Sequence, residues 1–124
     1  MKRILVVDDE EQIRDLLTRM LEFEGFVVDT AEDGEVGMAM LTDTSYALII
    51  IDMIMPVKDG LKLIMELVRD YPEQRILAIS GGGAIKAERY LTMAGYIGDD
   101  IAILEKPFTH EALLTLVNEQ LAQS

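Results

Sequence analysis

Five short apolar runs, separated by segments of mostly helical character, constrain the fold of this chain more than any other feature. The runs cover residues 3–7, 26–30, 46–51, 75–79 and 101–104. They are rich in valine, isoleucine and leucine, which is typical of strands buried on both faces of a parallel sheet. We therefore expect five strands that belong to one sheet.

The segments between these runs carry apolar residues at helical spacing, which predicts amphipathic helices. The clearest helix covers residues 10–24 and ends at Gly25, a residue type that suits a helix C-cap. On this helix we expect an inward stripe of Ile13, Leu16, Leu17, Met20 and Leu21. On the next two helices we expect Val36, Ala39 and Met40 (residues 34–41) and then Leu61, Ile64, Met65 and Val68 to face inward. On the last two we expect Ala84, Ala87, Leu91 and Ala94 (residues 84–94) and, in the helix capped by Thr109, Leu114, Val117 and Leu121.

Strand and helix alternate along the whole chain with short connections, which predicts an α/β fold of the doubly wound type. Right-handed crossovers place helices on both faces of the parallel sheet. The length of 124 residues suits one domain, which we expect to cover residues 1–124 as a (βα)5 unit.

Charge and composition exclude several classes of function. The net charge is −12, from 11 basic and 23 acidic side chains, so direct binding of nucleic acid is not expected. There is no cysteine, which excludes disulfides and thiolate metal sites. The apolar stretch of residues 4–7 is too short for a signal peptide or a membrane span. We expect a cytoplasmic protein that does not enter the membrane.

Chemically active side chains follow four of the five runs. Asp8 and Asp9 follow the first run, Asp52 the third, Ser80 the fourth and Lys106 the fifth. Ligands of open parallel sheets bind outside the carboxyl ends of the strands. We therefore expect these residues to converge on one edge of the sheet.

Three carboxylates at one edge repel one another, by about 4 kcal/mol for a pair about 4 Å apart at an effective dielectric constant of about 20, and such clusters capture cations. Oxygen ligands without histidine or cysteine favour Mg²⁺, with Mn²⁺ or Ca²⁺ as less selective alternatives. An ammonium and a hydroxyl group can contact the oxygens of a transferring phosphoryl group. A carboxylate can accept that group as an acyl phosphate.

Four strings in this order and spacing, ILVVDDE, IIIDMIMPVKDG, AISGGG and EKPF, resemble the receiver domains of bacterial two-component response regulators. The resemblance extends from Lys2 to about Leu121. It implies a flavodoxin-like fold with the strand order 2-1-3-4-5. It also implies a phosphoacceptor switch whose donor is a phosphohistidine on a sensor histidine kinase or a histidine phosphotransfer protein.

The resemblance implies a role for each residue that matches the family pattern. Asp52 would be the phosphoacceptor and, with Asp9, a ligand of Mg²⁺, for which Mn²⁺ could substitute. Asp8 would assist through a water molecule or through contact with one of the metal ligands, and Ile54 would offer its backbone carbonyl to the metal.

Two further residues of the pattern would act on the phosphoryl group. Lys106 would pair with the acidic cluster or the phosphoryl group, and Ser80 would donate a hydrogen bond to a phosphoryl oxygen. The bond between Lys106 and Pro107 is expected to be cis, a state that X-Pro bonds tolerate.

Three positions depart from the family pattern. Ile103 stands where these proteins usually carry a tyrosine or phenylalanine whose movement tracks phosphorylation, so another readout is needed. Ile54 and Gly82 stand where family side chains tune the hydrolysing water. Because Ile54 offers that water no hydrogen bond, we hypothesise slow spontaneous dephosphorylation.

The leading interpretation is a switch that acts by binding a downstream protein and is no enzyme beyond its own phosphorylation and dephosphorylation. Two alternatives stay open: a Mg²⁺-dependent phosphatase that turns over through an aspartyl phosphate, and a receiver-like binding module that is not phosphorylated. Residues 111–124 contain no Lys or Arg, so we expect a monomer, with a phosphorylation-linked dimer left open. An effector domain after Ser124 is also left open.

Other motifs suggest less specific roles. Residues 81–83 are all glycine, but no Gly-Lys-Ser/Thr follows, so a nucleotide-binding P-loop is not expected. His110 is the one histidine and is expected to lie in solvent. Three methionines (Met53, Met55 and Met65) are expected to fill the core. Tyr90 and Tyr96 fit either a partner-facing or a half-buried position.

Overall fold

The computed structural model describes residues 2–53, 60–80 and 101–122. Its elements are β1 (Arg3–Val7), α1 (Glu11–Phe23), β2 (Val27–Ala31), α2 (Gly34–Leu41), β3 (Leu48–Asp52), α3 (Gly60–Asp70), β4 (Ile76–Ser80), β5 (Ile101–Glu105) and α5 (His110–Ala122). The five strands form one parallel sheet in the order β2-β1-β3-β4-β5, as expected. The helix expected over 84–94 and the residues Ile54, Met55, Gly81–Gly83, Tyr90 and Tyr96 lie outside the described residues.

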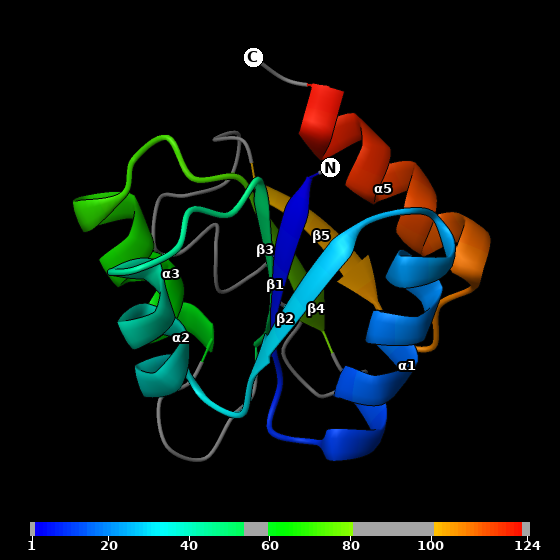
Figure 1. Ribbon diagram of the computed structural model, residues 1–124, viewed down its shortest axis with the longest axis horizontal. Helices are drawn as coiled ribbons and strands as arrows, with labels where there is room; N and C mark the ends of the chain where they lie inside the picture. The colour runs from blue at the N-terminus through cyan, green and yellow to red at the C-terminus, as the bar shows by residue number, and fades with distance from the viewer. Residues whose placement is uncertain (1, 54–59, 81–100, 123–124) are drawn as a thin grey trace.

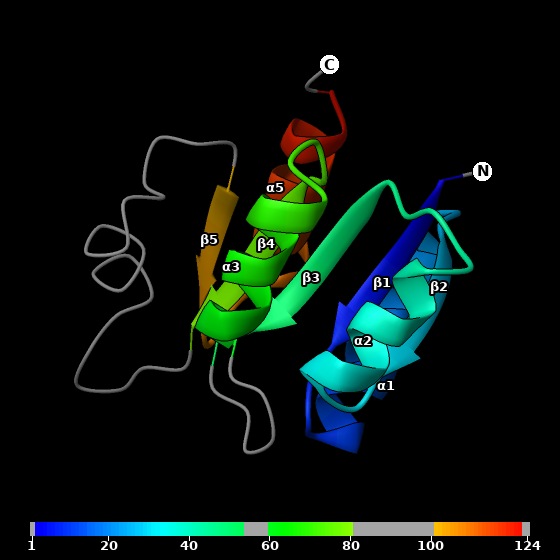
Figure 2. The same cartoon turned by 90° about the vertical axis from the view of Figure 1, so that its left-hand side faces the viewer.

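Helices cover both faces of the sheet, with α1 and α5 on one side and α2 and α3 on the other (Figures 1 and 2). Alternation along the strands supplies a core to each face. Leu5 and Val7 of β1 join the cluster under α2 and α3, whereas Ile4 and Val6 join the cluster under α1 and α5. None of the described helices has the length and apolar character that crossing a bilayer requires.

The strand predictions were displaced by one or two residues at several ends. The second and fourth strands begin and end one residue later than expected, and β3 begins at Leu48 and ends at Asp52. As a result, Asp52 and Ser80 are the last residues of their strands and belong to the hydrogen-bonded ladder. Their main chains are therefore fixed by the sheet itself.

The inward face of α2 was predicted only in part, because Met40 packs against the core but the other two expected residues do not. Val36 is 38% exposed and Ala39 is exposed, whereas Gly34, Gly37 and Leu41 are buried. A Cβ built on Gly37 would lie 3.2 Å from Cγ2 of Val7. At Gly37 the helix therefore approaches β1 so closely that a larger side chain would have to displace Val7.

Three other expected core positions also differ from the structure. Leu16 is 43% exposed and Met65 is 47% exposed, so neither fills the core, although Met53 does. On α5 the inward position belongs to Leu113 and not to Leu114, which is only half-buried.

Two further α5 residues make unexpected contacts. Gln120 is buried and donates a 2.7 Å hydrogen bond from Nε2 to the carbonyl of Ile76, which ties α5 to β4. His110 is half-buried and not fully solvated, because its Nε2 lies 3.5 Å from Oε2 of Glu24 and its ring meets that of Phe23 edge-on at 6.4 Å.

Candidate functional site

The first part of the site is the junction that follows β1. The parallel ladder ends at Val7, which is paired with Ala31 on one side and with Ile51 on the other. The amide of Asp8 continues this pattern by donating to the carbonyl of Ala31 at 3.1 Å. The chain then turns into α1, and Asp8 is 1% exposed whereas Asp9 is exposed.

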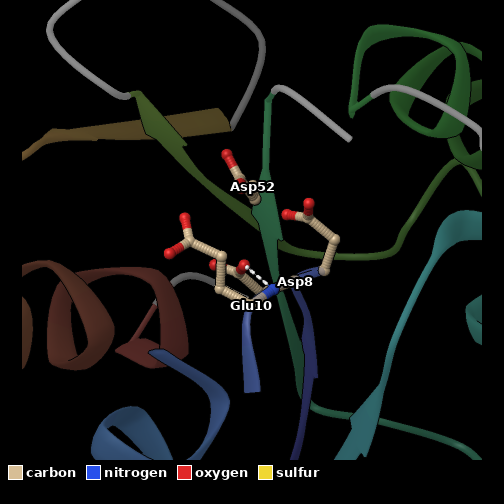
Figure 3. A group of neighbouring side chains, drawn as sticks. Asp8, Glu10 and Asp52 are labelled. Carbon is tan, nitrogen blue, oxygen red and sulfur yellow. Dashed lines mark hydrogen bonds between the residues drawn. The ribbon is translucent and has the colours of Figure 1, made fainter. Parts of the chain in front are cut away.

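Four carboxylates gather at this junction, and three of them are labelled in Figure 3. One oxygen from each residue lies within 4.8 Å of the others, and the four residues are Asp8, Asp9, Glu10 and Asp52. Asp52 comes from the end of β3 and is 5% exposed, which places a carboxylate at the central strand of the sheet. The expected convergence of Asp8, Asp9 and Asp52 is therefore what the structure contains.

The side chain of Asp8 is oriented by its neighbours. The amide of Glu10 donates to Oδ1 of Asp8 at 2.9 Å (Figure 3). Oδ2 is buried and has no hydrogen-bond partner among the described residues. Burial raises the pKa of Asp8, and the charges of Asp9 and Glu10 raise it further, against the Glu10 hydrogen bond and the charge of Lys106.

Asp8 has a buried carboxylate oxygen without a donor among the described residues, and its carboxylate lies within 4.8 Å of three others, which fits a divalent cation. The donor set consists of oxygen atoms only, which is the preference of Mg²⁺. The residues at this edge of the sheet therefore fit the Mg²⁺ that the sequence predicts. Ile54, the expected source of a backbone ligand, lies outside the described residues.

Ser80 and Lys106 lie on the two strands beyond β3. Ser80 ends β4, is 4% exposed and is paired in register with Glu105 of β5. The amide of Lys106 donates to the carbonyl of Ser80 at 2.8 Å. The positive charge of the Lys106 side chain lowers the pKa of Asp8. The ammonium group is thus within electrostatic reach of the acidic cluster. The peptide bond between Lys106 and Pro107 is cis, as predicted.

The start of α3 lies against Asp52. The amide of Gly60 donates to the carbonyl of Met53 at 3.1 Å. A Cβ built on Gly60 would collide with the main chain of Asp52 and Met53. Only glycine allows this helix to begin so near the end of β3.

Two residues near the site were missed by the sequence analysis. Glu10 was treated as the first residue of a helix, but it is the N-cap, with extended backbone angles (φ −93°, ψ 116°) and no side-chain cap bond. Arg14 was not singled out, yet its Nη1 donates to the carbonyl of Asp8 at 2.7 Å. The run of three acids in the string VVDDE was the available signal for Glu10.

Comparison with known proteins identifies the class. Residues 4–118 match the family model of the response regulator receiver domain, so the chain belongs to this family. It is a receiver domain of the two-component response regulators, a class of phosphoacceptor switches that generally bind Mg²⁺ in an acidic pocket.

Two curated relatives illustrate the similarity in sequence. The chain is 33% identical to the transcriptional regulatory protein CpxR of Klebsiella pneumoniae over 100% of this chain and 51% of the relative. It is 30% identical to the transcriptional regulatory protein ResD of Bacillus subtilis, over 98% of this chain and 49% of the relative. The chain thus spans about half the length of these curated relatives.

Two solved structures illustrate the similarity in fold. The receiver domain of NtrX from Brucella abortus superposes with a TM-score of 0.86 at 33% identity, covering 98% of this chain and 99% of the other. The response regulator TrrA from Thermotoga maritima, in complex with Mg²⁺ and BeF, has a TM-score of 0.80 at 32% identity, with coverages of 97% and 99%.

Proposed function

We propose that residues 1–124 act as a receiver domain in which Asp52 accepts a phosphoryl group from a phosphohistidine. The donor is a sensor histidine kinase or a histidine phosphotransfer protein, and the output is a contact with a downstream protein in the cytoplasm. The observation that carries the proposal is the buried carboxylate of Asp52 beside Asp8, Asp9 and Glu10 at the carboxyl edge of the sheet.

The reaction follows from the position of Asp52. A carboxylate oxygen attacks the phosphorus of the phosphohistidine, a P–O bond forms and the P–N bond breaks. The electron pair of that bond stays on the imidazole nitrogen, and the product is an acyl phosphate. Ser80 and Lys106 act on the transferred group as a hydrogen-bond donor and as a compensating charge.

The acidic cluster is the proposed site for Mg²⁺ or, less selectively, Mn²⁺. Asp9 and Asp52 are the proposed direct ligands, with Asp8 in support and the backbone carbonyl of Ile54 as a further ligand. When bound, the metal neutralises the charge that builds up on the transferring oxygens. Oδ2 of Asp8 supports this assignment, because it has no partner in the part of the chain that the structure describes and a buried anionic oxygen needs a positive partner.

Switching in this protein requires a readout other than aromatic rotation. Ile103 lies on β5, is half-buried and packs against the core under α2 and α3. Its branched side chain has no ring to turn between two positions. The proposed slow dephosphorylation depends on Ile54 and Gly82, which are outside the described residues, and it stays a prediction.

Intact-protein mass spectrometry tests the proposal directly. The protein is incubated with acetyl phosphate, with and without Mg²⁺, and we expect one phosphoryl adduct that depends on the metal. Asp52→Asn should abolish the adduct, whereas the exposed Asp43→Asn should not change it. An Asp52→Asn variant that still gains the adduct would move the acceptor elsewhere. Many phosphate molecules released per protein would favour a phosphatase.

A further inference from the structure

Asp8 is held at every polar atom except one. Its amide donates to the carbonyl of Ala31 at 3.1 Å, and its Oδ1 accepts from the amide of Glu10 at 2.9 Å. Its carbonyl accepts from Nη1 of Arg14 at 2.7 Å. The remaining atom, Oδ2, is the buried oxygen without a described partner. Two of these bonds fix the main chain of Asp8 and the third fixes Oδ1, so together they restrict the directions in which Oδ2 can point.

The hydrogen bond from Arg14 to Asp8 links the first turns of α1 to the end of β1. Arg14 lies in the first turns of α1, and its own amide donates to the carbonyl of Glu10 at 3.0 Å. Side chains on a helix lean toward its N-terminus, which brings the guanidinium back to the end of the strand. The carbonyl of Asp8 lies beyond the last ladder pair of β1, so the sheet does not hold it.

The charge of Arg14 and its hydrogen bond have opposite effects on a bound cation. A guanidinium group near an acidic cluster repels a metal ion, so by charge alone its removal strengthens metal binding. A hydrogen bond that fixes the main chain of a ligand residue has the reverse effect, because its removal weakens metal binding. The two roles can therefore be separated by experiment.

We propose that Arg14 is a positioning residue, which holds the carbonyl of Asp8 so that the free carboxylate oxygen of Asp8 faces Asp9 and Asp52. This inference rests on the proposed function, since the site it orders is the metal and phosphoacceptor site. Arg14 acts through Asp8 and touches neither the metal nor the phosphoryl group.

The test compares Arg14→Met, which removes both donor and charge, with Arg14→Lys, which keeps the charge and one donor. Arg19→Met is the matched control, because Arg19 is an exposed cation on the same helix. Mg²⁺ affinity is measured by calorimetry. We expect Arg14→Met to weaken it about tenfold, as loss of an outer-shell partner does. Arg14→Lys should recover most of that loss, and Arg19→Met should leave the affinity within about twofold.

A second measurement needs no metal. Hydrogen exchange in EDTA reports on the amide of Glu10, which donates to Asp8. We expect this amide to exchange about tenfold faster in Arg14→Met and close to the wild-type rate in Arg14→Lys and Arg19→Met. If Arg14→Met does not fold, Arg14→Leu takes its place, since it also removes both the charge and the donor.

The outcomes separate this inference from the proposed function. Unchanged or tighter Mg²⁺ binding in Arg14→Met, with a Glu10 amide protected as in the wild type, would overturn the role of Arg14 alone. A wild type that neither binds Mg²⁺ nor takes up a phosphoryl group would overturn the proposed function, and the exchange of the Glu10 amide would still decide whether Arg14 orders the junction.

Discussion

At the scale of single residues, Asp8 combines burial with the proximity of three other carboxylates. Asp8→Asn removes one negative charge and puts an amide donor where Oδ2 has no described partner. We expect the metal-free protein to become more stable by about 1 kcal/mol, or about 4 °C in melting temperature. Calorimetry in EDTA measures this, and a lower melting temperature for Asp8→Asn would contradict the prediction.

Tyr46 provides a test based on pH at the opposite edge of the sheet. Its hydroxyl donates to Oδ2 of Asp29 at 2.7 Å. Burial, together with this hydrogen bond and the charge of Asp29, raises the pKa of Tyr46 from 10.0 to about 12. In that window the folded state keeps a proton that the unfolded chain releases. The contribution to the free energy of unfolding is therefore complete below pH 10 and is lost as the pH rises toward 12.

Tyr46→Phe removes the titrating group and so serves as the comparison. Urea unfolding between pH 9 and pH 12 should show the wild type losing stability faster than Tyr46→Phe. Other basic groups titrate in the same range, but they are common to both proteins. Parallel pH profiles for the two proteins would contradict the assignment.

At the scale of elements, the start of α3 is fitted to the end of β3 through Gly60. Gly60→Ala places a Cβ against the main chain of Asp52 and Met53, so either α3 or the end of β3 must shift. We expect a loss of about 2 kcal/mol in the free energy of unfolding, with a slower phosphorylation of Asp52. Urea unfolding and mass spectrometry measure the two effects.

Gly25→Ala is the control for this element. Gly25 has φ +94° at the end of α1, and a Cβ there meets nothing within 4 Å. This variant should lose stability through backbone strain, by about 1 kcal/mol, yet should take up the phosphoryl group like the wild type. Equal phosphorylation by Gly60→Ala and Gly25→Ala would separate the fit of α3 from the site.

Periodicity in the sequence was sufficient to predict the strands, the described helices and the edge at which the polar residues meet. It failed for part of the contact face of α2, because Gly37 lies close to β1 only through having no side chain, and no apolar pattern reveals this. It also missed Glu10 and Arg14, whose roles depend on the backbone angles of the junction after β1 and on the reach of one side chain. The existence and order of the elements can be predicted from the sequence, whereas strand ends and such junction contacts require coordinates.

At the scale of the whole molecule, the net charge of −12 and the local acidic cluster respond differently to salt. Sodium chloride screens the general repulsion, and any cation does so in proportion to ionic strength.

Mg²⁺ bound at the cluster adds RT ln(1 + [Mg²⁺]/Kd), which is about 1.4 kcal/mol at ten times Kd. At equal ionic strength, MgCl₂ should therefore raise the melting temperature of the wild type about 5 °C above that in NaCl. Asp8→Asn and Asp52→Asn should lose most of this excess while keeping the response to NaCl, because they alter the cluster and barely change the total charge. An excess of the same size in all three proteins would mean that Mg²⁺ acts on the diffuse charge of the surface and not at the edge of the sheet.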